Sequence, residues 1–231
     1  MTDSKAAKPD TGERFTRKVL PSRDHWLEER RKGIGGSDAA AILGLSPWKS
    51  NTQLWEEKTG LREPDQPSNL EAIEYGNRAE GSLRQLFKLD FPEFKVRYRN
   101  HQILQSNIAP WMQASLDGEL TDRDGRQGIL EIKTTRIASS MQSESWAGQV
   151  PQTYYCQLLH YLLVTGYDFA VLVAQLKYDY GANRPMKKTT RHYHFEAKDL
   201  EADMRHLLAA EVRFWQQVES RTRPAQILPS I

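Results

Sequence analysis

The N-terminal third of the chain has the pattern of short helices that end at glycines. Trp26 and Arg30 lie four residues apart and so share one face of a helix. Serine caps a helix start well, and glycine commonly ends a helix. The pattern predicts three helices, which begin at Ser22, Ser37 and Ser50 and end at Gly33, Gly44 and Gly60.

A longer helix is predicted after a loop over 61–67, with a capping box formed by Ser68 and Glu71 and an end before Pro92. Glu80 falls on the otherwise apolar stripe of this helix and therefore needs a partner. The periodicity then changes to that of short extended segments. Strands are predicted over 94–99, 102–105, 113–120 and 128–134, with a hairpin turn at 124–125.

The rest of the chain alternates helices and strands. A helix is predicted over 151–164, strands over 168–176 and 191–195, and an amphipathic helix over 200–215. This order predicts the α/β fold class. Residues 1–21 are polar and lack apolar periodicity, which predicts a disordered tail. We expect one domain over 22–225 and a C-terminal tail over 226–231.

Composition narrows the class of protein further. The 231 residues contain no apolar run long enough to span a membrane, and residues 1–10 lack the apolar segment of a secretory leader, so we expect a cytoplasmic protein. The single cysteine, Cys156, excludes an intramolecular disulfide and a zinc site built from cysteines. A net charge of +2 is too small to indicate nucleic-acid binding by itself.

Candidate chemistry lies where the predicted strands meet the next helix. Side chains alternate along a strand, so Glu131 and Lys133 share one face of the segment GILEIK over 128–133. Asp117 lies 14 residues before Glu131, and the hairpin turn would return the chain beside it. Two converging carboxylates suit Mg²⁺, which prefers oxygen ligands. The alternative is an exposed, salt-bridged strand face.

The Asp117, Glu131 and Lys133 pattern resembles the catalytic motif of the PD-(D/E)xK nuclease superfamily. Three further segments resemble motifs of the YqaJ-type viral recombinases, the family that includes lambda exonuclease, and all occur in that family's order. They are WLEERRKGIGGSDAA over 26–40, YGNRAE over 75–80 and YYCQLLHY over 154–161. The chain departs from the pattern at Leu159, where the family often has a second glutamine.

The resemblance implies a PD-(D/E)xK restriction-endonuclease-like core, with a central mixed β-sheet flanked by helices and a helical N-terminal region. It implies a magnesium-dependent 5′→3′ exonuclease that acts on linear double-stranded DNA with a 5′-phosphate and leaves 3′ single-stranded overhangs for strand annealing. Two Mg²⁺ ions, replaceable by Mn²⁺, a trimeric ring and a single-strand annealing recombinase partner are also implied. The alternatives are an inactive DNA-end-binding module and a restriction-type endonuclease.

The resemblance also assigns roles to residues of the predicted site. Asp117, Glu131 and the main-chain carbonyl of Ile132 would hold metal, and Glu80 would bind it directly or through water. Lys133 would orient the attacking water or neutralise charge in the transition state. The alternative for Glu80 is a buried ion pair with an arginine.

A second group of residues is expected to bind DNA. Arg30 and Ser37 match family positions that grip the 5′-phosphate, and a guanidinium suits that group. The alternative is that the glycine-rich segment before Ser37 only caps two helices. Gln157 and Tyr161 share a helix face, and both are expected to bind DNA; the alternative for Gln157 is an ordinary polar residue on the helix surface. Trp48, in a predicted loop, is the candidate contact to the DNA end.

Overall fold

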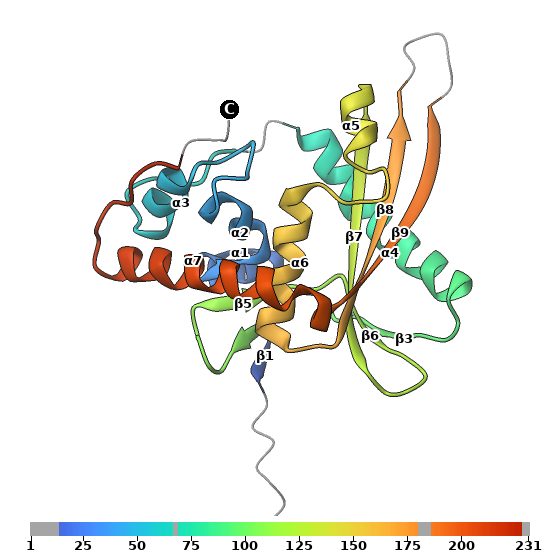
Figure 1. Ribbon diagram of the computed structural model, residues 1–231, viewed down its shortest axis with the longest axis horizontal. Coiled ribbons are helices and arrows are strands. Elements are labelled where there is room, and N and C mark those ends of the chain that lie inside the picture. The colour runs from blue at the N-terminus through green and yellow to red at the C-terminus, as the bar shows by residue number, and fades with distance from the viewer. Residues whose placement is uncertain (1–13, 67–68, 180–185, 228–231) are drawn as a thin grey trace, which may run out of the picture.

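Two β-sheets and the helices around them form the protein in the computed structural model, which describes residues 14–66, 69–179 and 186–227 (Figure 1). The four-stranded sheet has the order β1-β4-β5-β2, and the five-stranded sheet has the order β3-β6-β7-β8-β9. The strands are β1 Phe15–Val19, β2 Ile34–Gly35, β3 Lys95–Arg97, β4 Gln102–Ser106, β5 Met112–Ala114, β6 Gly118–Thr121, β7 Gln127–Ile137, β8 Phe169–Tyr178 and β9 Lys187–Glu196. The helices are α1 Arg23–Arg31, α2 Gly36–Ile42, α3 Asn51–Lys58, α4 Leu70–Asp90, α5 Ser140–Glu144, α6 Gln152–Thr165 and α7 Glu201–Glu219, with a 3₁₀ turn over Ala197–Leu200.

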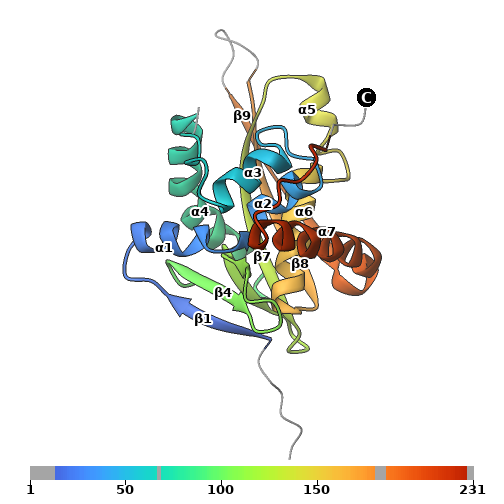
Figure 2. The ribbon, with the colours of Figure 1, turned by 90° about the vertical axis from the view of Figure 1, so that its left-hand side faces the viewer.

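The five-stranded sheet is covered by a helix on each face (Figures 1 and 2). Strands β7 and β8 are parallel, and the chain between them passes through α5 and α6. Leu130 of β7 packs against Phe87 of α4 on one face, whereas Ile129 packs with Leu158 of α6 on the other. This alternation along β7, which is buried on both faces over 128–132, confirms the predicted α/β class and mixed sheet. None of the described helices combines the length and apolarity that a membrane crossing requires.

A second layer of helices lies behind α6. Alanines of α2 and Leu207 of α7 pack against Leu159 of α6. His160 and Glu211 are both fully buried, and the His160 Nδ1 atom lies 2.7 Å from the Glu211 Oε1 atom. The other ring nitrogen, Nε2, lies 2.9 Å from the Gln113 carbonyl oxygen. Leu159, which stands where the family often has a glutamine, is therefore a core residue.

The prediction that residues 1–21 form a disordered tail is wrong for 15–19, and residues 1–13 lie outside the described part. Residues 15–19 form β1, which pairs antiparallel with β4. Only Phe15 of this strand is buried, and the sequence FTRKV shows no alternation of apolar and polar residues that would predict a strand. Arg17 also joins Glu119 of β6 through two hydrogen bonds of 2.7 and 2.8 Å. A contact between residues so far apart in sequence leaves no local pattern.

Two predicted helix starts differ in the structure. Helix α2 begins at Gly36 with Gly35 as its cap, because the Asp38 carboxylate accepts a hydrogen bond from the Gly35 N–H at 3.1 Å. Ser37 therefore lies inside the first turn and does not cap it. Ser68 falls outside the described residues, and Asn69 caps α4 by accepting from the Ala72 N–H at 3.0 Å. The predicted helix start at Ser22 and the capping box of Ser50 and Gln53 are confirmed.

The predicted strand over 113–120 is two strands. Its first part belongs to β5 of the four-stranded sheet and its second part to β6 of the five-stranded sheet. The chain crosses between the sheets over residues 115–117, so Asp117 lies at the crossing. An alternating pattern cannot reveal a change of sheet, because both halves keep the same period.

The stability of the fold is expected to depend on pH through the carboxyl group of Glu119. Burial raises the pKa of its carboxyl, but hydrogen bonds from Arg17, Tyr167 and Arg97 outweigh burial and lower the pKa to about 2. Because the folded pKa lies below the unfolded one, this stabilisation is full above about pH 4.5 and is lost as the pH falls toward 2. We expect Glu119→Gln to lower the free energy of unfolding by about 1–2 kcal/mol at pH 7, since Arg17 is partly exposed.

Urea unfolding of the two proteins at pH 7 and pH 3 measures this effect. The difference between wild type and Glu119→Gln is expected to shrink at pH 3. Glu201→Gln is the matched control, because Glu201 is 63% exposed and its contact to Arg205 is 3.5 Å long. An equal difference at both pH values would contradict the assignment.

Candidate active site

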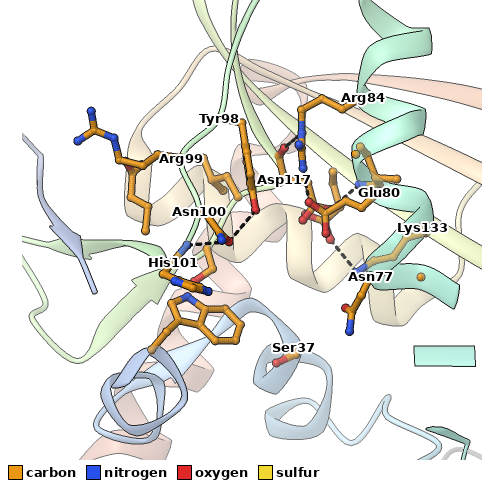
Figure 3. Close-up of a pocket in the computed structure, with 18 of the residues that line it drawn as sticks. Ser37, Asn77, Glu80, Arg84, Tyr98, Arg99, Asn100, His101, Asp117 and Lys133 are labelled. Carbon is orange, nitrogen blue, oxygen red and sulfur yellow. Dashed lines mark hydrogen bonds and ion pairs between the residues drawn. The ribbon is translucent and has the colours of Figure 1, made fainter. Parts of the chain in front are cut away.

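A pocket of about 740 Å³ lies where the two sheets meet α1 and α4. The residues that line it include Glu80, Asp117, Glu131, Ile132 and Lys133, although they come from three separate parts of the chain. Figure 3 shows Glu80, Asp117 and Lys133 pointing toward one another. The structure therefore brings together all the residues that the sequence proposed as metal ligands or as the catalytic lysine.

Asp117 is held at the crossing between β5 and β6. Its Oδ2 atom accepts a hydrogen bond of 2.7 Å from the Ile132 N–H, and its carbonyl oxygen accepts one of 2.6 Å from the Arg84 Nε–H. Gly118 pairs with Leu130 across the β6–β7 ladder, which fixes Asp117 beside Glu131. Burial raises the pKa of the Asp117 carboxyl, against the lowering effect of Lys133.

Glu131 is 2% exposed and only half of its carboxylate is satisfied. Its Oε1 atom lies 2.7 Å from the Lys133 Nζ atom and accepts a 2.7 Å hydrogen bond from Gln157. The Oε2 atom is buried and has no hydrogen-bond partner among the described residues. Burial and the charge of Asp117 raise the pKa of Glu131 to about 8. A buried carboxylate oxygen without a partner is costly, and a bound cation would relieve that cost.

Lys133 stays charged despite its environment. Burial alone would lower the pKa of its ammonium group, but Glu131 and Asp117 outweigh burial and raise that pKa. Its Nζ atom also lies 5.1 Å from the centre of the Tyr154 ring, within cation–π distance. A positive charge is thus fixed beside the two carboxylates at neutral pH.

Glu80 forms an ion pair with Arg84, one helical turn later in α4. Burial and the nearby Asp117 raise the pKa of Glu80 to about 7. Arg84, which was not predicted as a site residue, also lies over the Tyr98 ring, with its Cζ atom 3.5 Å from the ring centre. Its spacing of four residues from Glu80 was the available sign. The arginine pair proposed as the alternative for Glu80 is thus present, and it lies inside the pocket.

Helix α6 supplies Gln157 and Tyr161, and both line the pocket although they are nearly buried. The Gln157 Nε2–H groups donate to Glu131 and, at 2.9 Å, to the Tyr161 hydroxyl. Close packing of α2 keeps them in place, because a Cβ at Gly36 would lie 2.5 Å from the Tyr161 ring. Gln157 is therefore a support of Glu131 and not an ordinary surface residue.

Arg30 and Ser37 lie at one end of the same pocket. The Arg30 Nη2 atom donates to the Ser37 hydroxyl at 3.2 Å, and its guanidinium lies 4.4 Å from the centre of the Trp26 ring. The structure does not bring Trp48 to this pocket. That side chain is 71% exposed in the α2–α3 loop and is not among the residues that line the cavity.

The donor set suits a hard divalent cation. It consists of carboxylate oxygens, and the partnerless Oε2 atom of Glu131 is available to a ligand. Each of the three carboxylates at present bonds to protein groups, and no three His, Cys, Asp or Glu side chains in the described ranges already form a metal-ligand set. The hydrogen bond from the Ile132 N–H uses one oxygen of Asp117 and the ion pair with Arg84 uses one oxygen of Glu80, so each carboxylate has a second oxygen that can bind the cation.

Comparisons with solved structures agree with this fold. The alkaline exonuclease LHK-Exo from Laribacter hongkongensis superposes with a TM-score of 0.58 and 15% identity, over 87% of this chain and 96% of that one. A complex of LHK-Exo with dAMP gives the same TM-score of 0.58, with 16% identity. These likenesses show that the chain shares the fold of LHK-Exo, in agreement with the mixed sheet flanked by helices that the sequence predicts.

Comparisons of sequence identify the family. The uncharacterized protein YqaJ of Bacillus subtilis (strain 168) is 37% identical over 200 residues, which make up 84% of this chain and 56% of that protein. The chain thus spans only about half the length of this curated relative. The model of the YqaJ-like viral recombinase domain matches residues 25–168, a range that contains Arg30, Asp117 and Lys133. The chain therefore belongs to the YqaJ-like viral recombinase domain family.

Proposed function

We propose that the protein is a magnesium-dependent 5′→3′ exonuclease that degrades the 5′-ended strand of linear double-stranded DNA. The observation that carries the proposal is the convergence of Asp117, Glu131 and Lys133, with one buried carboxylate oxygen left without a partner. A relative of the same fold is an alkaline exonuclease and has been seen with dAMP. A deoxynucleoside monophosphate is the product that an exonuclease releases.

The reaction is hydrolysis of a phosphodiester bond. Magnesium bound at this site would lower the pKa of water and offset charge on the scissile phosphate. Asp117, Glu131 and Glu80 would hold the ion, and the carbonyl of Ile132 is the further ligand that the family resemblance implies. Gln157 keeps the Glu131 carboxylate in position. Lys133 supplies a fixed positive charge that orients the attacking water or stabilises the pentavalent transition state.

Arg30 and Ser37 would bind the 5′-phosphate of the strand being degraded. Arg30 presents a planar fork of donors, and its contact with the Trp26 ring limits the positions it can adopt. The Ser37 hydroxyl adds a second donor 3.2 Å from the guanidinium. Fixing the terminal phosphate at one end of the pocket would place the next phosphodiester bond over the carboxylates.

Digestion of three DNA substrates tests the proposal. With Mg²⁺, the protein is expected to release mononucleotides from a linear duplex with 5′-phosphates, to release them more slowly from the 5′-hydroxyl duplex, and to leave closed circular duplex intact. A chelator should stop release. Cleavage of the closed circle would favour a restriction-type endonuclease, and tight binding without release would favour an inactive end-binding module.

Arg30→Ala separates the 5′-phosphate contact from the chemistry. This variant is expected to lose the preference for the 5′-phosphorylated duplex, because the guanidinium that binds the phosphate is gone. Arg31→Ala removes the same charge from the next residue, whose only ion pair in the described part is a 3.6 Å surface contact with Glu63. It should keep the preference, and an equal loss in both variants would contradict the role of Arg30.

A further inference from the structure

Two arginines that line the pocket have no hydrogen-bond or ion-pair partner in the described part of the chain. The inner cations, Lys133 and Arg84, are paired with the carboxylates, and Arg30 is bonded to Ser37. Arg23 and Arg99 also line the pocket and are exposed, yet they form no hydrogen bond or ion pair within the residues that the structure describes. We call this pair the arginine rim.

The arginine rim lies on one side of the pocket mouth. Arg23 is the first residue of α1, and Arg99 lies in the loop between β3 and β4. The Leu20 N–H donates to the His101 carbonyl at 3.0 Å, which holds the segment before α1 against that loop. Figure 3 shows the Arg99 side chain pointing away from Glu80 and Asp117. Its charge is therefore presented outside the acidic floor of the pocket.

No comparable charge is found among the other described residues that line the pocket. On the α4 side, the residues that line the pocket outside Glu80 and Arg84 are uncharged: Ile73, Gly76, Asn77 and Gly81. Three carboxylates at the floor repel a polyanion, and their charge is offset locally by Lys133 and Arg84. Free positive charge for further phosphates is thus found at the rim, in addition to Arg30.

We propose that Arg23 and Arg99 form a second phosphate-binding subsite, which holds the DNA backbone outside the catalytic pocket. This inference rests on the proposed function, because it takes DNA as the ligand. The subsite is separate from the terminal-phosphate contact of Arg30. It contacts backbone phosphates, which are present in DNA of any sequence and with either 5′ group. It therefore contributes affinity without distinguishing a 5′-phosphate from a 5′-hydroxyl.

Equilibrium binding without hydrolysis tests the subsite. The full chain is titrated onto fluorescent linear duplexes with a 5′-phosphate or a 5′-hydroxyl in the presence of a chelator, at KCl concentrations from about 50 to about 300 mM. Arg23→Ala/Arg99→Ala is expected to weaken binding about tenfold and to reduce the slope of log K against log [salt] by about 2, one unit for each lost phosphate contact. It is expected to keep the preference for the 5′-phosphate.

The control is Arg123→Ala, in the β6–β7 turn. Arg123 is also exposed and unpaired within the described ranges, but it does not line the pocket. The Arg123→Ala variant should leave the slope of log K against log [salt] unchanged. An unchanged slope in the double variant, or an equal decrease in Arg123→Ala, would overturn the subsite alone. Failure of the wild-type chain to bind either duplex would overturn the proposed function and the subsite together.

Discussion

Lys133→Ala is expected to slow nucleotide release about 10²- to 10³-fold, the usual cost of removing one preorganised charge from a transition state. Lys133 is held 2.7 Å from Glu131, and the neighbouring carboxylates keep its ammonium charged. No other described lysine lines the pocket, and the nearby Arg84 is already paired with Glu80, so its charge does not replace that of Lys133. DNA binding should persist, because Arg30 and the arginine rim are untouched.

Single-turnover release of nucleotides at saturating DNA measures this effect. Lys198→Ala is the control, since Lys198 is an exposed lysine of the 3₁₀ turn and does not line the pocket. It should retain the wild-type rate. If Lys133→Ala stays within about threefold of wild type, Lys133 does not stabilise the transition state.

Glu131→Gln is expected to abolish magnesium-dependent hydrolysis and also to stabilise the metal-free protein at neutral pH. The pKa of Glu131 is raised by burial and by Asp117 to about 8. The folded state therefore favours the protonated carboxyl, and stability falls as the pH rises from about 4.5 to 8. An amide removes this penalty, so we expect a gain of about 1–3 kcal/mol at pH 8.

Thermal unfolding with and without Mg²⁺ tests both parts of this prediction. The melting temperature of the wild-type protein should rise with Mg²⁺, because a ligand that binds only the folded state stabilises it. Glu131→Gln should start higher and respond less. Glu144→Gln, an exposed residue of α5, should match wild type throughout. A variant that is less stable than wild type and still responds fully to Mg²⁺ would contradict the assignment of Glu131.

The centre of the site could be predicted because its geometry is local. Glu131 and Lys133 share a face through the alternation of one strand, and the turn at 124–125 returns that strand beside Asp117. The carboxylate of Glu80 on an apolar helix face was likewise a local anomaly. These features depend on backbone periodicity, which the sequence carries directly.

The parts that could not be predicted depend on contacts between distant segments. β1 is stabilised by β4 and by the Arg17–Glu119 pair, and neither partner is visible from residues 15–19. Arg84 gains its importance from Asp117, 33 residues later. Trp48 lies in a loop, as the sequence predicts, but the tryptophan that lines the pocket is Trp26, from the helix that also carries Arg30. In each of these cases the position of the residue depends on contacts with segments far away in sequence, which a local pattern does not show.

The crossing at residues 115–117 and the turn over 122–126 should differ in how well they tolerate inserted residues. A residue inserted in the turn over 122–126 would lengthen only an exposed connection, since the β6–β7 ladder fixes Gly118 opposite Leu130. A residue inserted between Ala114 and Gly118 would lengthen a short crossing whose two ends are held by separate strand ladders, and directly after Asp117 it would separate the Asp117 carboxylate from the Ile132 N–H. Natural and engineered length variants should therefore accumulate at the turn and be purged from the crossing.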